Sequence, residues 1–141
     1  MLNAVFNTAQ FWDGRARDLA EQAGGPIENP IEMGITHEHA IAMLRAIPGY
    51  AEPFAAAFPD DPEPIDIDNV RYAIEAFEAT LITPNSPFDQ YLRSDDAALD
   101  DKQKQGLGLF VQRGCAGCHN GVNLGGDQYA PFGVVENPGA E

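Results

Sequence analysis

Residues 115–119 carry the pattern with the clearest chemistry in this chain, Cys115-Ala116-Gly117-Cys118-His119. Cys-x-x-Cys-His is the attachment signature of a c-type haem. Two thiols three positions apart on a tight turn can reach two carbons on one porphyrin edge, and the histidine that follows can ligate the iron. We therefore expect Cys115 and Cys118 to hold haem c covalently and His119 to be the proximal iron ligand.

A Cys-x-x-Cys pair has other uses, as a thioredoxin-like dithiol, half of a zinc site or a disulfide. The zinc interpretation needs more soft ligands, and the chain has only two cysteines. A redox dithiol is expected on a βαβ background, and no segment alternates at period two for long enough to predict a strand. Haem attachment is favoured, and a free or disulfide-bonded pair is the alternative.

The elements that must position this motif are predicted to be helices. Four apolar residues share one helix face: Val70, Ile74, Phe77 and Leu81. Asp68 is a plausible N-cap for that helix. Other helices are predicted at four places: after Thr36 as far as the Ile47-Pro48-Gly49 turn, over 50–58, after Ser86-Pro87, and over 100–113. The predicted fold class is mostly α, with cytochrome c-like haem domains and long irregular loops, each domain incomplete in this chain.

Three segments rich in proline and glycine are predicted to be irregular connections: 24–34, 59–64 and 121–139. Loops of this length are uncommon unless they are functional or wrap a ligand. The best boundary is Thr83-Pro84-Asn85-Ser86-Pro87, because a helix cannot continue through it. We therefore predict two parts, 1–82 and 83–141.

The charge balance of the 141 residues is strongly acidic, with 22 Asp and Glu against 8 Lys and Arg and a net charge of −14. Such a surface repels nucleic acid and anionic membranes. It could attract a basic protein partner, although composition alone favours a solvated acidic surface. No apolar run reaches the length of a membrane span. Haem c is attached outside the cytoplasm, yet no export signal is visible in the sequence. We therefore expect a periplasmic protein, with either its leader peptide removed or the sequence being a fragment of a longer chain.

A second group of motifs lies upstream of the Cys-x-x-Cys-His turn. It comprises Phe11-Trp12-Asp13-Gly14-Arg15-Ala16, Gln22, Glu28-Asn29-Pro30-Ile31-Glu32-Met33-Gly34, and Thr80-Leu81-Ile82-Thr83-Pro84-Asn85-Ser86-Pro87-Phe88-Asp89. Taken with Gly114–Gly121, these segments resemble the bacterial dihaem cytochrome c peroxidase family over essentially the whole chain.

The resemblance implies two haem domains that face each other. Residues 1–82 would be the C-terminal part of the peroxidatic haem domain, and 83–141 the N-terminal part of the electron-transfer haem domain, with His119 as its proximal ligand. Trp12 would be the electron relay between the haems. Gln22 and Glu32 would be the polar pair on the distal face of the peroxidatic haem.

The implied reaction, reduction of hydrogen peroxide to water, suits these residue types. Cleavage of the O–O bond requires a proton to move from one oxygen to the other, and a single carboxylate can act as base and then acid. Glu32 would do this, with Ile31 and Met33 as an apolar neighbourhood and Gln22 positioning the peroxide. Glu28 is the competing carboxylate, and chemistry alone does not choose between them.

Several family features are absent from the 141 residues. They are a first Cys-x-x-Cys-His, a resting-state histidine and an axial methionine after the motif, so we expect a central fragment that is inactive when isolated. His37 and His39 could mimic a metal pair, but exposed positions at a helix start are favoured.

The resemblance also implies partners and cofactors for the complete protein. They are two haems c and a small c-type cytochrome or cupredoxin as electron donor. Calcium binding and a homodimer are also compatible with the resemblance. The rivals are a dihaem relative that oxidises another substrate, such as the enzyme that matures tryptophan-derived quinones, and a monohaem electron-transfer module without catalysis.

Overall fold

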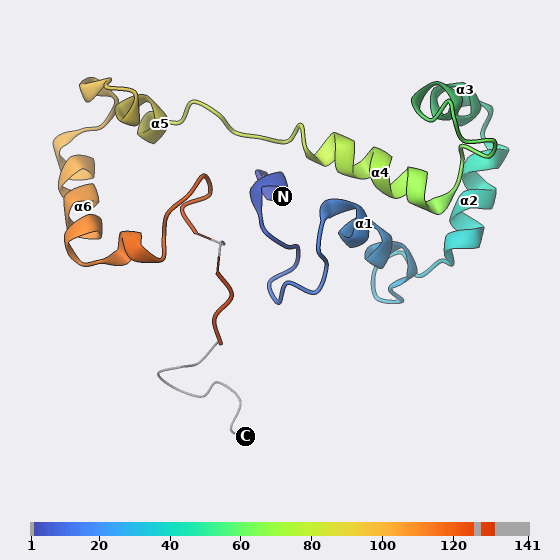
Figure 1. The fold of residues 1–141 in the computed structure, drawn as a ribbon, viewed down its shortest axis with the longest axis horizontal. Coiled ribbons are helices and arrows are strands. Elements are labelled where there is room, and N and C mark those ends of the chain that lie inside the picture. Colours follow the sequence, from blue (N-terminus) through green and yellow to red (C-terminus); the bar gives the residue numbers. More distant parts are fainter. Residues whose placement is uncertain (1, 126–127, 132–141) are drawn as a thin grey trace. The chain divides into compact units, whose positions relative to one another are not determined.

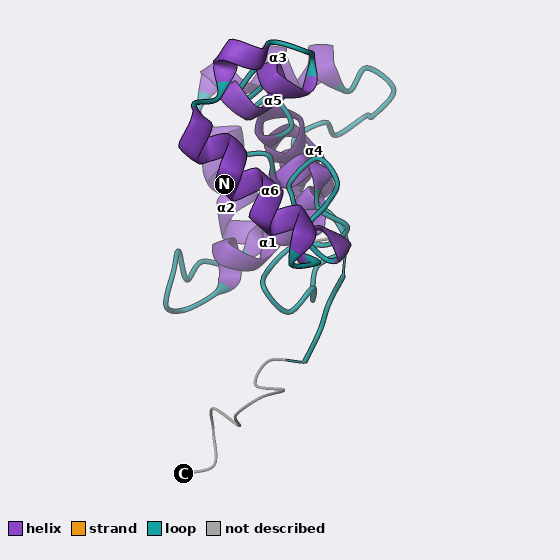
Figure 2. Ribbon diagram, turned by 90° about the vertical axis from the view of Figure 1, so that its left-hand side faces the viewer, coloured by secondary structure: helices purple, strands orange, loops and turns teal. Residues whose placement is uncertain are grey.

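The computed structural model describes residues 2–125 and 128–131, which form helices joined by loops (Figure 1). The α-helices are α1 (Leu19–Glu28), α2 (His37–Ala46), α3 (Pro48–Ala57), α4 (Ile67–Glu78), α5 (Pro87–Leu92) and α6 (Asp101–Gln112). Three 3-10 turns accompany them: η1 (Ala4–Phe6), η2 (Asp96–Ala98) and η3 (Cys115–Gly117). Figure 2 shows helices and loops, and no strand, in the part of the chain that is described. The predicted mostly α fold class is confirmed.

The chain divides into two compact units, Met1–Ile82 and Thr83–Glu141. In the first unit, the Asn3 amide donates to the Leu81 carbonyl at 2.8 Å, so the start of the unit is tied to the segment that follows α4. The assignment of the units to peroxidatic and electron-transfer haem domains stays a prediction. Among the described residues, no helix combines the length and apolar character needed to cross a bilayer.

The core of the first unit is the contact between α1 and α4. Its buried apolar residues are Leu19, Ala20, Ala23 and Ile27 on α1 and Val70 on α4, and Ile65 is buried in the loop before α4. Small residues on α1 admit the Arg71 side chain of α4, whose Nε donates to the Ala20 carbonyl at 2.9 Å and whose Nη1 donates to Asp68 at 3.1 Å. A Cβ on Gly24 would stand 3.1 Å from Arg71 Nε. The absence of a side chain at Gly24 therefore makes room for this arginine.

Helix α1 corrects one prediction, because Gly24, Gly25 and Pro26 lie inside it and not in a connection. Leu19, Ala23 and Ile27 recur every four residues and are buried, so packing outweighs the low helix propensity of the Gly-Gly-Pro run. Pro26 falls two residues before the helix ends. The other two predicted connections differ: 59–64 is irregular, and 121–139 is only partly within the described residues.

The helix starts follow capping rules, with one correction. Thr36 caps α2, and Ser86 and Asp100 each form a capping box, at α5 and α6. The N-cap of α4 is Asp66 and not Asp68: Asp66 has extended backbone angles and accepts from the Asn69 amide at 2.7 Å. Asp68 lies within the first turn, where it pairs with Arg71. Two further boundaries move, because α3 begins at Pro48 and Leu81 lies beyond the end of α4.

The second unit presents α6 and the turn that follows it. Leu99 is buried, Leu107 and Phe110 on α6 are half-buried, and Val111 is 58% exposed. At Gly106 and Gly108, an added Cβ would meet no atom within 4 Å. The two glycines are two positions apart and so lie on opposite faces of α6, and neither packs against another part of the described chain.

Candidate functional site

The Cys-x-x-Cys-His segment forms a single tight turn directly after α6. Gly114 adopts φ +80°, which reverses the chain at the helix end, and η3 follows. The amides of Cys118 and His119 both donate to the Cys115 carbonyl, at 3.2 Å and 2.9 Å. Both cysteines are free and exposed. The turn therefore presents two accessible thiols and an imidazole from five consecutive residues.

The orientation of His119 is set by its own turn. Its Nδ1 lies 3.2 Å from the Leu124 carbonyl. A carbonyl can only accept, so Nδ1 carries the hydrogen and Nε2 is left with its lone pair for a metal. Gly125 makes this possible, because its φ is +141° and an added Cβ would stand 3.1 Å from Nδ1. Phe110 of α6 flanks the imidazole, with ring centroids 6.0 Å apart.

Asn120 is a residue that sequence reasoning missed. Its side-chain amide donates to the Ala116 and Gly117 carbonyls, both at 3.2 Å, and so closes the turn from the far side. The available signal was its position directly after the motif, since asparagine commonly bonds to backbone groups of a nearby turn. The contact to Leu124 had no such signal, because it depends on a backbone carbonyl.

The residues of this turn fit haem c. The donor set has two exposed thiols and one imidazole with a free Nε2. Residues 114–125 include no Asp, Glu, Lys or Arg. Val122 and Leu124 are 69% and 48% exposed. A porphyrin face is apolar, so uncharged and apolar surroundings suit it.

The predicted residues of the first unit start with Trp12, whose side chain projects from a closed loop. A single antiparallel bridge joins Gln10 to Ala16 at the loop base. Arg15 lies over the Phe11 ring at 3.5 Å and pairs with Asp13 at 2.8 Å. Trp12 takes no part in these contacts and is 84% exposed.

Gln22 and Glu32 belong to one continuous segment, α1 and the turn after it. Gln22 is half-buried on α1. The turn folds back on the helix end, because the Met33 amide donates to the Pro26 carbonyl at 3.1 Å and the Ile35 amide to the Ile27 carbonyl at 2.9 Å. Glu32, at the tip of this turn, is exposed.

The apolar neighbourhood predicted for Glu32 does not enclose it. Ile31 is 89% exposed and Met33 is 60% exposed. These two side chains are next to Glu32 in sequence but point to solvent. In the part of the chain that the structure describes, they therefore do not shield the Glu32 carboxylate from water.

The two competing carboxylates have different surroundings. Glu28 accepts from the His37 amide at 3.3 Å, and its Oε1 lies 3.6 Å from His37 Nδ1. His37 Nε2 also contacts the Gly24 carbonyl at 3.0 Å. Glu28 and His37 therefore join α1 to α2, and His37 is half-buried, not exposed as predicted. Within 2–125 and 128–131, no group of three or more His, Cys, Asp or Glu could hold a metal ion.

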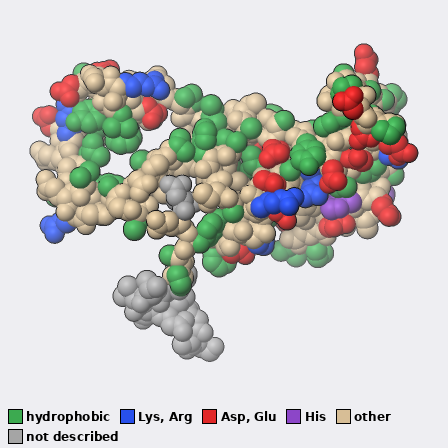
Figure 3. Space-filling model, in the orientation of Figure 1, with side chains coloured by type: hydrophobic (Ala, Val, Ile, Leu, Met, Phe, Trp, Pro, Cys, Tyr) green, Lys and Arg blue, Asp and Glu red, His purple; other side chains and the backbone are tan. Residues whose placement is uncertain are grey.

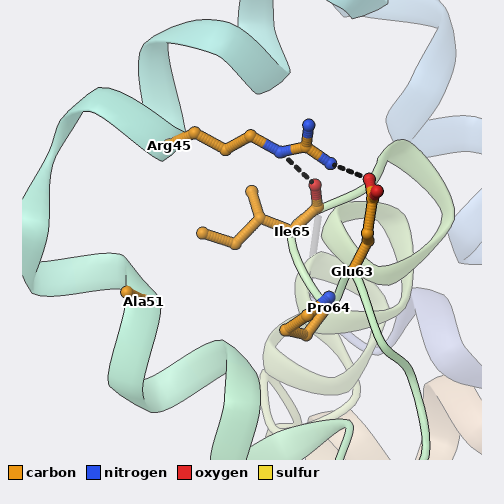
Figure 4. Close-up of a pocket in the computed structure, with 5 residues that line it drawn as sticks. All are labelled: Arg45, Ala51, Glu63, Pro64 and Ile65. Atoms are coloured by element: carbon orange, nitrogen blue, oxygen red, sulfur yellow. Dashed lines mark hydrogen bonds and ion pairs between the residues drawn. The ribbon is translucent and has the colours of Figure 1, made fainter.

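A pocket of about 290 Å³ in the first unit is lined by Arg45, Ala51, Glu63, Pro64 and Ile65 (Figure 4). The Arg45 guanidinium donates to the Ile65 carbonyl at 3.1 Å and to the Glu63 carboxylate at 3.0 Å. This arginine joins α2 to the loop before α4. Its charge is already paired, and none of the predicted site residues lines the pocket.

A helical chain with an exposed Cys-x-x-Cys-His turn belongs to the class of c-type haem proteins. Residues 1–97 match the family model described as di-haem cytochrome c peroxidase. The chain belongs to the di-haem cytochrome c peroxidase family.

Named relatives agree with this assignment. The chain is 56% identical to the cytochrome c551 peroxidase of Pseudomonas aeruginosa, over 99% of this chain and 40% of that protein. It is 46% identical to the cytochrome c551 peroxidase of Nitrosomonas europaea, over 99% of this chain and 43% of that protein. The chain therefore spans about two fifths of the length of these curated relatives.

A solved structure shares the fold. It is a MauG-like protein associated with microbial copper homeostasis, with a TM-score of 0.77 and 30% identity, over 88% of this chain and 37% of that one.

Proposed function

We propose that the protein is a cytochrome c peroxidase that reduces hydrogen peroxide to water. Each turnover combines one peroxide with two electrons and two protons and gives two waters. The electrons would come from a small c-type cytochrome or a cupredoxin. The peroxidase names of relatives at 56% and 46% identity favour this activity. The observation that carries it is the exposed Glu32 carboxylate on a turn locked to α1, in the same unit as Gln22 and Trp12.

This chain would attach one haem c, and the complete protein two. Cys115 and Cys118 would form the thioether links, and His119 would ligate the iron through Nε2. When bound, haem supplies the iron centre for peroxide reduction and stores electrons between steps. Residues 83–141 would then be part of the electron-transfer domain and residues 1–82 part of the peroxidatic domain.

The residues of the first unit would handle the proton and the substrate. The Glu32 carboxylate would accept a proton from one peroxide oxygen and return it to the other, which leaves as water. Gln22 would orient the peroxide by hydrogen bonding. Trp12, exposed on its loop, would lie in the path of the electron between the two haems.

The choice of Glu32 over Glu28 rests on their partners. Glu28 is occupied by the His37 amide and imidazole, which join α1 to α2. Glu32 has one side-chain bond, to Asn29. A group that must gain and lose a proton in each turnover needs an accessible oxygen, and Glu32 offers one.

The experiment compares two matched variants of the complete, haem-loaded protein. Glu32→Gln is expected to lower peroxide turnover by roughly 10²–10⁴-fold, the usual range for a general acid–base group, and to leave the spectrum of the His119 haem unchanged. Glu28→Gln is the control and should leave turnover within a few-fold. If Glu28→Gln abolishes turnover and Glu32→Gln is silent, the assignment is wrong.

A second candidate function is that this protein, like a MauG-like enzyme, oxidises a substrate other than a cytochrome. The solved MauG-like structure favours it, at 30% identity. The peroxidase relatives, at 56% and 46%, favour the first candidate more strongly.

The remaining proposals concern location and partners. We propose a periplasmic protein, because c-type haem is attached outside the cytoplasm. Figure 3 shows acidic side chains gathered over the α2–α3 end of the first unit, and with the net charge of −14 this surface would favour a basic electron donor. Calcium binding and a homodimer are further proposals for the complete protein.

A further inference from the structure

Asn29 contacts Glu32 in a way that its position at the end of α1 alone does not require. Its side-chain nitrogen donates to Glu32 Oε2 at 2.7 Å, and its side-chain oxygen accepts from the Ile31 amide at 3.2 Å. The backbone amide can only donate, so the amide oxygen must face Ile31 and the amide nitrogen must face Glu32. Both ends of the side chain are thus fixed by different partners.

The backbone of Asn29 is held as firmly as its side chain. Its amide donates to the Gly25 carbonyl at 3.1 Å, and its carbonyl accepts from the Glu32 amide at 2.9 Å. Asn29 is half-buried, whereas Glu32 is exposed. The exposed glutamate is therefore anchored by the half-buried C-cap residue of α1.

The two oxygens of Glu32 are not equivalent. Oε2 accepts from Asn29, and Oε1 has no hydrogen-bond partner within the described residues. An amide fixes the carboxylate without adding a positive charge, which would oppose protonation. One oxygen is anchored and the other is left open for a proton.

We infer that Asn29 is the positioning residue for Glu32: its amide anchors Oε2 and leaves Oε1 as the oxygen that takes the proton from peroxide and returns it. This inference rests on the proposed function of Glu32. It predicts that Asn29 affects turnover only through that carboxylate.

The test is a double-mutant cycle in the complete, haem-loaded protein, with hydrogen peroxide as substrate and a reduced c-type cytochrome as donor. Asn29→Asp keeps an oxygen for the Ile31 amide and replaces the donor to Glu32 by a repelling carboxylate. It should lower kcat about 10- to 100-fold, as expected for loss of a hydrogen bond to a charged group. In the Glu32→Gln background the same substitution should change kcat by less than about twofold.

Two further variants control the cycle. Asn85→Asp adds the same charge in the second unit and should leave kcat unchanged. Asn29→Ala removes both side-chain contacts of Asn29, and should lower kcat in the same way while circular dichroism tests whether the fold survives. If Asn29→Asp does not fold, the same cycle is completed with Asn29→Ala.

Each outcome has a distinct meaning. An equal loss of kcat in both backgrounds means that Asn29 only supports the fold, and it overturns the inference. Unchanged kcat in Asn29→Asp overturns it as well, while the role of Glu32 stands. A silent Glu32→Gln rejects the proposed role of Glu32 and the inference together.

Discussion

Two adjacent glycines of α1 should respond differently to alanine. Gly24 faces Arg71, and an added Cβ would stand 3.1 Å from its Nε and 3.4 Å from its Cδ. Gly25 is exposed, and a Cβ there would meet only the Phe11 ring, at 3.9 Å. Gly25 also precedes Pro26, whose ring disfavours the helical conformation for a residue with a Cβ, so an Arg71→Ala background is needed to isolate the Arg71 contact of Gly24.

The magnitudes decide the sign. Replacing glycine by alanine inside a helix gains about 1 kcal/mol. At Gly24, displacement of Arg71 from the Ala20 carbonyl would cost about 1.5–3 kcal/mol, the range for a hydrogen bond to a charged group. We therefore expect Gly24→Ala to destabilise the first unit by about 0.5–2 kcal/mol. At Gly25 the restriction before Pro26 offsets part or all of the helix gain, so Gly25→Ala should change the free energy of unfolding by less than about 1 kcal/mol.

Thermal unfolding followed by circular dichroism at 222 nm, an α-helical band, would measure both effects. For a domain of this size each kcal/mol shifts Tm by about 4–8 °C. Gly24→Ala should become stabilising in an Arg71→Ala background, because the obstructing side chain is gone. If Gly24→Ala raises Tm when Arg71 is present, the arginine yields freely and the expected destabilisation is refuted.

Two further predictions concern a helix cap and haem attachment. The pKa of Asp18 is lowered by the hydrogen bond from the Glu21 backbone amide and then by Arg17. The contribution of Asp18 to stability is therefore present above about pH 4 and is lost as the pH falls further. Between pH 5 and pH 3, Tm should drop less in Asp18→Asn than in the wild type. When the protein is exported in a host with c-type maturation machinery, mass spectrometry after denaturation should find one haem bound to this chain, and Cys118→Ala should weaken that link; haem lost entirely from the denatured wild type would contradict covalent attachment.

The sequence was sufficient where local rules decide the structure. The caps at Thr36, Ser86 and Asp100 depend on residues three positions apart; the Thr36 cap was predicted, and helices were predicted to start at Ser86-Pro87 and Asp100. Helix α1 was missed because its stability comes from contact with α4, which outweighs the Gly24-Gly25-Pro26 signal. Propensity cannot report a contact between segments some 50 residues apart, such as that from Arg71 to Ala20.

The candidate site divides in the same way. The spacing of Cys115, Cys118 and His119 indicated the attachment turn directly. The choice between Glu28 and Glu32 stayed open in the sequence because both are glutamates near one turn. Their partners differ, because Glu28 contacts His37, on the next helix, and Glu32 contacts Asn29. The Asn29 contact was also hidden, since an asparagine at a helix end usually serves only its own backbone.

The exposed position of Trp12 gives the protein an intrinsic optical reporter. It is the only tryptophan among these 141 residues, so all indole emission from this chain comes from one site. With 84% of its surface open to solvent, the ring should emit at long wavelength and be quenched readily by small solutes such as iodide. Anything that covers the loop would shift the emission to the blue and protect it from iodide, and a haem nearby would extinguish it by energy transfer. In the haem-free chain, anything that covers this loop can thus be followed by fluorescence without a label, and a haem brought close to it by the loss of emission.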